Sequence, residues 1–225
     1  MISWQRWSAT DVGNRRAENE DALVLRDADG FWAVIDGLGG PDAGRVASAA
    51  LAYALENLSL QEGLADAVDQ LEDVLVAVHE QLLEFSSQQQ PTRLLGCTAA
   101  LVRITQGWSL MAWVGDVRLY RWRDRELKQL GDDHVGFGAE DLTRLIGANT
   151  MLPDFLLFKP QPGDRYLICS DGLHGELGTA RIAYWLARDP ILAQRELLAE
   201  ALAAGGRDNL SFVMLDIGGD DDEQG

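Results

Sequence analysis

Residues 98–130, TAALVRITQGWSLMAWVGDVRLYRWRDRELKQL, are the most informative part of the chain about its fold. They contain four apolar segments in succession, at residues 98–104, 108–114, 119–122 and 126–130, separated only by short turns. Short runs rich in β-branched and aromatic side chains, bounded by turn residues, are typical of β-strands. The stretch therefore predicts consecutive antiparallel strands, without the helical crossover that parallel neighbours need.

Strand-like segments also flank this block on both sides. Residues 22–25 and 31–35 are joined by Asp27-Ala28-Asp29-Gly30, which is a typical hairpin turn. Four further segments are expected to be strands, at residues 4–10, 155–158, 166–170 and 209–217. Because strands follow one another in blocks, antiparallel sheets fit the sequence better than a doubly wound parallel sheet.

Helices are expected in pairs outside these sheets. Apolar residues recur at steps of three and four along residues 64–82, and a second stripe covers residues 47–58. Residues 86–91 are polar and predict a linker inside the domain. Two late helices precede the last strand, with the Asp189-Pro190 pair typical of a helix start and Gly205 typical of a helix end. The expected fold class is α+β.

The composition fits one domain with an unusual charge. The chain has 225 residues, 47% of them hydrophobic, and its 36 acidic and 19 basic residues give a formal net charge of −17. This length suits a single domain with a full core. The basic residues are not strongly clustered, which argues against binding nucleic acid or an acidic membrane surface. Metal cations are the partners that such acidity favours.

Neither a signal peptide nor a membrane span is expected. Residues 1–13 have no apolar stretch after a basic one, and no apolar run is as long as a bilayer-spanning helix. We therefore expect a cytoplasmic protein in which Cys97 and Cys169 are reduced and buried.

Four aspartates stand at the end or start of an apolar strand: Asp36, Asp116, Asp171 and Asp208. Burying several carboxylates together costs free energy unless cations neutralise them. Without an accompanying cluster of Cys or His, these carboxylates favour Mg²⁺ or Mn²⁺ over zinc. A single Asp-Gly pair is also typical of a turn, and spacing along the chain does not itself bring the four together.

A dense polar segment, DVGNRRAENED at residues 11–21, lies just before a strand. An arginine among clustered carboxylates can form a structural ion pair, or it can hold a substrate phosphate with two parallel hydrogen bonds. Both interpretations stay open on the residues alone.

Short motifs are spread in order along nearly the whole chain: DVGNRRAENED (11–21), AVIDGLGG (33–40), LGCT (95–98), VGDVRLY (114–120), DDH (132–134), PGDRYLICSDGL (162–173) and GGRDN (205–209). Together they resemble the motifs of bacterial metal-dependent Ser/Thr protein phosphatases of the protein phosphatase 2C (PPM) family. The resemblance implies a four-layer α-β-β-α sandwich of two antiparallel sheets flanked by helices. Residues 1–217 would form this catalytic domain, and residues 218–225 an acidic, disordered tail.

The resemblance also implies roles for individual residues. Asp36 would bridge two divalent ions, Mn²⁺ or Mg²⁺, and the carbonyl of Gly37 would bind one of them. Asp171 and Asp208 would bind the other ion. Asp116, together with Asp171, would hold a third ion.

Four further residues would act around the ions. Arg16 would bind the substrate phosphate, so Arg16 and Asp36 are the catalytic candidates. Glu20 and Asp21 would act mainly through metal-bound waters, and Asn209 would lie in the outer shell. A hydroxide bridging two ions would then attack phosphorus in line, without a phosphoenzyme.

The implied activity is hydrolysis of phosphoserine and phosphothreonine in proteins. The expected partners are a phosphorylated protein and a cognate Ser/Thr kinase, for a monomer that binds neither nucleic acid nor membrane. Compact bacterial members often oppose a partner kinase, including those that control type VI secretion. Two alternatives remain open: a pseudophosphatase that binds without catalysis, and a phosphoesterase of small molecules.

The sequence departs from the family at the position of a proposed general acid. Leu38 and Pro41 stand where many members have a histidine. The leaving alkoxide would then take its proton from metal-bound water or another group. His174 is the one histidine expected near the site, either as this acid or as a rim residue.

A second departure is a much shortened flap. Bacterial relatives usually have a helical flap after the DDH motif, but here only residues 135–141 separate His134 from Leu142. We expect a tight loop and a more open site, with a weaker third metal site at Asp116. A milder departure is Val117, where the family usually has serine.

Overall fold

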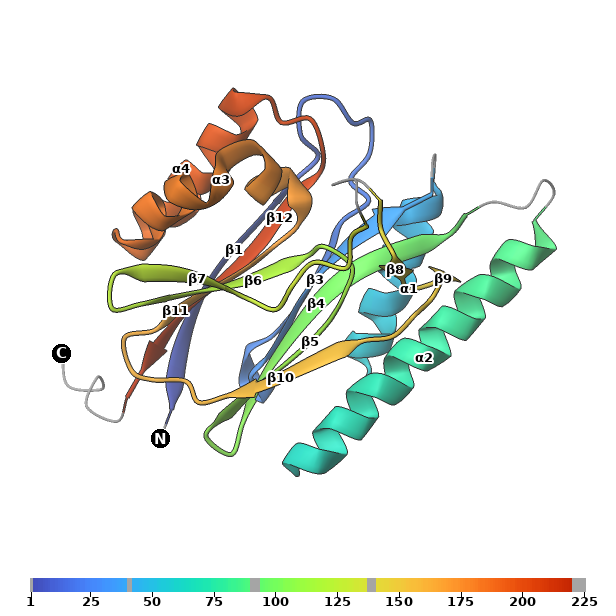
Figure 1. The fold of residues 1–225 in the computed structure, drawn as a ribbon, viewed down its shortest axis with the longest axis horizontal. Coiled ribbons are helices and arrows are strands. Elements are labelled where there is room, and N and C mark those ends of the chain that lie inside the picture. Colours follow the sequence, from blue (N-terminus) through green and yellow to red (C-terminus); the bar gives the residue numbers. More distant parts are fainter. Residues whose placement is uncertain (1, 40–41, 90–93, 137–140, 220–225) are drawn as a thin grey trace.

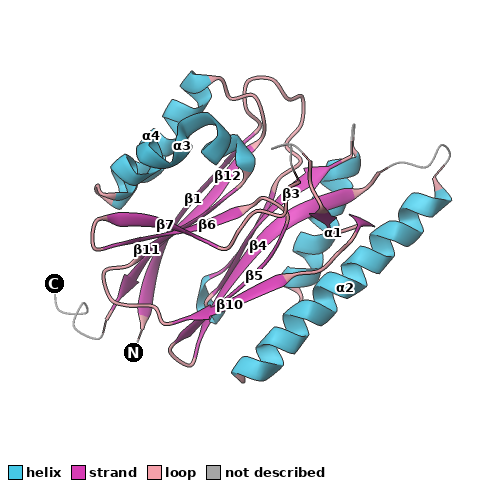
Figure 2. Ribbon diagram, in the orientation of Figure 1, coloured by secondary structure: helices cyan, strands magenta, loops and turns pink. Residues whose placement is uncertain are grey.

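Two sheets and four helices form a sandwich. The computed structural model describes residues 2–39, 42–89, 94–136 and 141–219. In this part of the chain two five-stranded sheets lie face to face, and helices cover their outer faces (Figure 1). All neighbouring strands of both sheets are antiparallel. The expected α-β-β-α architecture is therefore confirmed, and Figure 2 shows its separation into strand and helix layers.

The chain changes sheets inside the block of residues 98–130. The first sheet has the order β1 (Ser3–Asp11), β12 (Leu210–Gly218), β11 (Arg165–Cys169), β6 (Arg118–Arg123) and β7 (Glu126–Leu130). The second has the order β10 (Asp154–Phe158), β5 (Trp108–Val114), β4 (Gly96–Thr105), β3 (Phe31–Leu38) and β2 (Ala22–Arg26). Hairpins β4–β5 and β6–β7 thus belong to different sheets, and Asp116 lies at the crossing.

The helices pack in two pairs. Helices α1 (Ala43–Glu56) and α2 (Leu64–Gln88) cover the second sheet, whereas α3 (Asp171–Leu186) and α4 (Pro190–Ala204) cover the first (Figure 1). The predicted start of α4 is confirmed, because the Asp189 side chain accepts a hydrogen bond from the backbone N–H of Leu192 at 3.0 Å.

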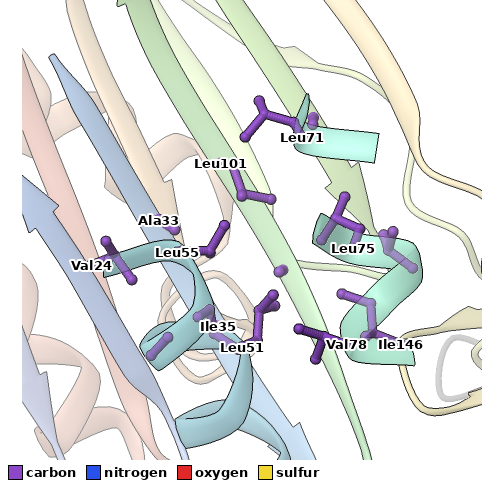
Figure 3. Packing of buried hydrophobic residues seen from close by; sticks show 14 of the residues in the cluster. Val24, Ala33, Ile35, Leu51, Leu55, Leu71, Leu75, Val78, Leu101 and Ile146 are labelled. Atoms are coloured by element: carbon purple, nitrogen blue, oxygen red, sulfur yellow. The ribbon is translucent and has the colours of Figure 1, made fainter. Parts of the chain in front are cut away.

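Three hydrophobic layers separate the four structural layers. Ala33 and Ile35 of β3 face α1 and α2, where Leu55 and Leu75 pack against the sheet (Figure 3). Trp32 and the other alternate residues of β3 face the opposite sheet. A third cluster lies between the first sheet and helices α3 and α4. Central strands are buried on both faces, which is why their sequences are continuously apolar rather than alternating.

Some local expectations need correction. The polar linker predicted at residues 86–91 begins too early, because α2 continues to Gln88; the hydroxyl of Ser87 donates to the carbonyl of Glu84, so these polar residues are compatible with a last helical turn. A small hairpin of β8 (Arg144–Leu145) and β9 (Ala148–Asn149) was not predicted. The turn at residues 27–30 is a short 3₁₀ helix, η1 (Asp27–Asp29), closed by Gly30 in the left-handed conformation.

The ends of the predicted short flap are held together. The N–H of Gly136 donates to the carbonyl of Asp141 at 2.7 Å, and Val135 pairs with Leu142. Residues 137–140 of this loop, and residues 220–225 of the predicted tail, lie outside the described residues. None of the described helices is both long and apolar enough to cross a lipid bilayer.

Candidate metal centre

Tertiary structure brings the predicted acidic residues to one end of the sandwich. Asp36 lies near the end of β3 and Asp116 follows β5, while Asp171 is the first residue of α3, separated from β11 by Ser170 alone. Asp208 precedes β12, and Asp21 precedes β2. In Figure 1 this end carries the loops between β1 and β2 and between α4 and β12, opposite the marked chain termini.

The carboxylates are close enough to repel one another. Burial raises the pKa of Asp36 well above that of an ordinary aspartate, and the charges of Asp21, Asp171, Asp116 and Asp208 raise it further. The pKa of Asp171 is also raised, first by burial and then by Asp208. Such a cluster is stable as carboxylates only if cations neutralise it.

Burial also raises the pKa values of Asp21 and Asp116. Burial raises the pKa of Asp21 to about 7, although hydrogen bonds from Ser211 and Ser170 oppose this rise. The Ser170 hydroxyl donates to Asp21 Oδ2 at 2.9 Å. Burial, with help from Asp171, raises the pKa of Asp116 to about 6. Both carboxyl groups therefore keep a proton to a higher pH than an ordinary aspartate does.

The donors fit a hard divalent ion. Within the described residues, Asp171 Oδ1 is buried and has no hydrogen-bond partner, so a ligand of opposite charge would satisfy it. Carboxylate oxygens are the ligands that Mg²⁺ and Mn²⁺ prefer. In the part of the chain that is described, no three such side chains already converge at ligand distance.

Gly37 lies in close backbone packing at the site. A Cβ atom on Gly37 would stand 2.2 Å from the carbonyl oxygen of Gly44 in α1 and 2.6 Å from that of Glu20. Only glycine allows this approach, which places the backbone of Gly37 and Glu20 beside Asp36. The predicted positions of Gly37 and Glu20 at the site are thus compatible with the packing.

Arg16 and Asn209 connect the N-terminal segment to the site. Arg16 Nη2 donates to Asp208 Oδ2 at 2.5 Å, and about half of the Arg16 side chain is exposed. Asn209 Nδ2 donates to the carbonyls of Val12 and Glu18, both at 2.9 Å, and its Oδ1 accepts from the N–H of Glu20 at 2.8 Å. Asn209 therefore fixes the segment that presents Arg16 and Glu20.

The sequence model of the protein phosphatase 2C family matches residues 14–204 of the chain. This chain belongs to the protein phosphatase 2C family. The resemblance read from the motifs is thereby confirmed.

Two relatives define how much of a phosphatase 2C protein the chain covers. PstP, a serine/threonine protein phosphatase of Mycobacterium tuberculosis, is 27% identical over 227 residues, which cover 92% of this chain and 44% of PstP. PhpP, a protein phosphatase of Streptococcus pneumoniae, is 27% identical over 241 residues, which cover 95% of this chain and 98% of PhpP. The chain thus spans less than half of PstP but nearly all of PhpP.

Solved phosphatase 2C structures superimpose closely on this chain. PppA, described as a key regulatory component of T6SS in Pseudomonas aeruginosa, gives a TM-score of 0.90 at 27% identity, covering 96% of this chain and 98% of PppA. The PstP catalytic domain in complex with two manganese ions gives 0.87 at 26% identity, covering 97% of this chain and 100% of that domain.

Two of the three histidines of this phosphatase 2C member support one turn of the site. His134 Nδ1 accepts from the N–H of Gly115 at 3.0 Å, and its Nε2 bonds Asp154 Oδ2 at 3.0 Å. His174 Nε2 bonds the carbonyl of Asp116 at 3.1 Å, and burial lowers the pKa of His174 to about 4. Both rings therefore brace the turn that carries Asp116.

A hollow of about 310 Å³ opens beside the candidate metal centre. It is lined by Asp171, Gly172, Gly175, Glu176, Arg207 and Asp208. Sequence reasoning missed Ser170, Glu176 and Arg207. Ser170 lies inside the SDG motif and could have been noticed, but Glu176 and Arg207 are 31 positions apart and carry no motif signal that joins them.

Proposed function

We propose that this chain is a Mn²⁺- or Mg²⁺-dependent phosphatase that removes phosphate from phosphoserine and phosphothreonine in proteins. The observation that carries the proposal is the placement of five half-buried aspartates, adjoining strands of both sheets, at one end of the sandwich. Membership in the family and the named activity of PstP support the same reaction.

The ligand set follows the residues at the end of the sandwich. Asp36, Asp171, Asp208 and the carbonyl of Gly37 would hold two ions, and Asp116 would hold a third together with Asp171. When bound, the divalent ions would activate a water molecule as nucleophile and polarise the phosphoryl oxygens. The PstP structure with two manganese ions supports this choice of metal.

The protein itself supplies orientation and charge. Arg16 would bind the phosphate, since its exposed guanidinium lies beside Asp208 at the rim of the site. Asp21 and Glu20 would hold waters around the ions, and Asn209 positions Glu20. We assign protonation of the leaving alkoxide to solvent, because His174, with a pKa near 4, is neutral at pH 7 and bonds a backbone carbonyl.

Neither cysteine would act as nucleophile. Cys97 and Cys169 are both buried, and burial raises the pKa of each thiol. A thiol that stays protonated is a weak nucleophile. The proposed reaction therefore passes through no cysteinyl phosphate.

Hydrolysis of an aryl phosphate and a phosphoserine peptide tests the proposal, with Mn²⁺ present or chelated. We expect turnover only with Mn²⁺, and loss of turnover in Asp36→Ala. Metal binding by an inactive wild type would favour the pseudophosphatase, and full activity of Asp36→Ala would exclude this site. Comparing turnover of a phosphoprotein with turnover of free phosphoserine separates a protein phosphatase from a small-molecule phosphoesterase. The short connection between Gly136 and Asp141 is compatible with either activity.

We further propose that the enzyme acts in the cytoplasm as a monomer and opposes a cognate Ser/Thr kinase. The similarity to PppA, over nearly the whole of both chains, favours control of type VI secretion as its role. Phosphoproteomics after gene deletion tests this: phosphorylation should rise on components of the secretion apparatus and should return to normal on complementation.

A further inference from the structure

The loop that carries Asp208 is held on one side by the N-terminal segment. The N–H of Asn14 donates to the carbonyl of Gly206 at 2.7 Å. Its side-chain Nδ2 donates to the carbonyls of Leu202 and Gly205, at 2.7 and 3.0 Å. Gly206 has a left-handed φ of +53°, a conformation that suits glycine.

On the other side, Glu176 of α3 holds the same loop. Glu176 Oε1 accepts from the backbone N–H of Arg207 at 3.0 Å and from its Nε at 2.9 Å, while Oε2 accepts from Nη2 at 3.2 Å. The Glu176 side chain is only 5% exposed, whereas that of Arg207 is 73% exposed. The buried carboxylate is therefore the fixed member of the pair.

This contact joins two candidate metal ligands. Glu176 belongs to the helix that begins with Asp171, and it bonds the residue directly before Asp208. Arg16 binds Asp208 as well, at 2.5 Å. Gly172 of α3 packs against the carbonyl of Asn209, which restrains the chain after Asp208. Among the described residues of α3, Glu176 alone hydrogen-bonds the 205–208 loop, so it restrains the chain before Asp208.

We propose that Glu176 is a positioning residue that holds the Asp208 loop against α3, so that Asp208 and Asp171 can bind the same ion. The inference rests on the proposed metal-dependent function. Removing a group that hydrogen-bonds and orients a metal ligand commonly lowers metal affinity by about 10- to 100-fold. The bond to the backbone N–H of Arg207 is the essential one, because it restrains the main chain beside Asp208.

Calorimetric titration of the full chain with Mn²⁺, without substrate, tests the proposal. Glu176→Leu keeps side-chain bulk but accepts no hydrogen bond, and we expect it to weaken Mn²⁺ binding about tenfold. Glu176→Gln can still accept a hydrogen bond from the backbone N–H of Arg207, and Arg207→Ala keeps that N–H. The Mn²⁺ affinity of each variant should therefore fall by less than about threefold. The Mn²⁺ concentration for half-maximal aryl phosphatase activity should rise in parallel, and saturating Mn²⁺ should restore most of the rate.

Glu200→Ala is the matched control. Glu200 of α4 accepts hydrogen bonds from Arg181 and from Trp185 Nε1 of α3. It therefore forms another glutamate–arginine ion pair in the same helix layer, partly exposed, and no described hydrogen bond joins it to the Asp208 loop. It should lower the thermal midpoint without changing Mn²⁺ affinity. If Glu176→Leu does not fold, Glu176→Ala replaces it, and a thermal melt verifies folding.

Two results would overturn the positioning role. One is wild-type Mn²⁺ affinity in a folded Glu176→Leu or Glu176→Ala protein, and the other is an equal loss of affinity in Glu200→Ala. Failure of the wild type itself to bind Mn²⁺ would instead overturn the proposed function, so the two failures are distinguishable.

Discussion

At the residue scale, the dominant feature is a group of carboxylates with too few nearby cations. Arg16 pairs with Asp208 at the rim, but Asp36 and Asp21 lie deeper, where burial raises the pKa of both. A group whose ionisation is opposed in the folded state destabilises that state when it is charged. Without bound cations, the charged aspartates therefore lower the stability of the fold. Replacing one of them with an uncharged residue should raise that stability.

Asp36→Asn should stabilise the protein when divalent ions are chelated. The amide keeps the size of the side chain and removes the buried charge, so we expect the free energy of unfolding to rise by about 1–3 kcal/mol. Urea denaturation with a chelator measures it. Asp133→Asn is the control: Asp133 pairs with Arg118 at 2.6 Å, so its neutralisation should lower stability. A less stable Asp36→Asn protein would contradict the account.

The chelated protein should become less stable as pH rises from about 4 to about 7. The folded pKa of Asp21, about 7, exceeds its ordinary value of 3.8, so the folded state binds the extra proton throughout this window and unfolding releases it. Asp116, with a pKa near 6, acts in the same direction. Thermal midpoints should therefore be higher at pH 5.5 than at pH 8, and Asp21→Asn should reduce the difference. If the difference between the thermal midpoints at pH 5.5 and pH 8 is unchanged in Asp21→Asn, other groups cause the pH dependence.

At the element scale, the site depends on how closely β3 approaches the start of α1. Gly37 of β3 and Gly44 of α1 touch through their backbones, and a Cβ atom on either would meet the other within 2.6 Å. The preceding segment is packed there too, through the backbone of Glu20. This approach lets Asp36 stand at a strand end that α1 partly covers.

Gly37→Ala should disrupt this element contact. The added methyl would meet backbone, which cannot rotate away, so we expect a loss of at least about 2 kcal/mol of stability together with weaker Mn²⁺ binding. Gly175→Ala is the matched control, because a Cβ atom on this helical glycine meets nothing within 4 Å. It should raise stability by about 0.5–1 kcal/mol in urea denaturation. Equal effects of the two substitutions would show that close approach is not the cause.

At the scale of the whole molecule, the acidic end links the two sheets. Asp36 and Asp116 extend from the second sheet, whereas Asp171 and Asp208 adjoin strands of the first. Ions bound between them would tie the two halves of the sandwich together. They would also offset part of the net charge of −17, which otherwise favours expansion.

Mn²⁺ should therefore stabilise the whole fold. A ligand that binds only the folded state at 100 times its dissociation constant adds about 2.7 kcal/mol. Thermal melts should show the rise with Mn²⁺ but not with NaCl of equal ionic strength, since screening alone cannot replace ligation. In Asp171→Asn the Mn²⁺ effect should shrink. A rise of equal size with NaCl would indicate charge screening rather than a bound ion.

Much of this molecule was predictable because its signals are local. Apolar runs with short turns indicated the strands, and the Asp189-Pro190 pair indicated the start of α4. The two-residue strands β8 and β9 were missed, since segments so short carry no periodicity. The end of α2 was misplaced because polar residues 86–88 can occupy an exposed helical turn as well as a linker. Roles for Arg16, Asp36 and the other ligands came from ordered motifs rather than from periodicity.

The strand blocks, the paired helices, the acidic balance and the family motifs are all recognisable along the chain. That Asp36, Asp116, Asp171 and Asp208 share one end, and that Glu176 reaches the Asp208 loop, becomes visible only in the folded molecule. The reason is physical: strand and helix patterns arise from neighbours along the chain, whereas repulsion among carboxylates and a bond across 31 positions exist only after the sheets have packed.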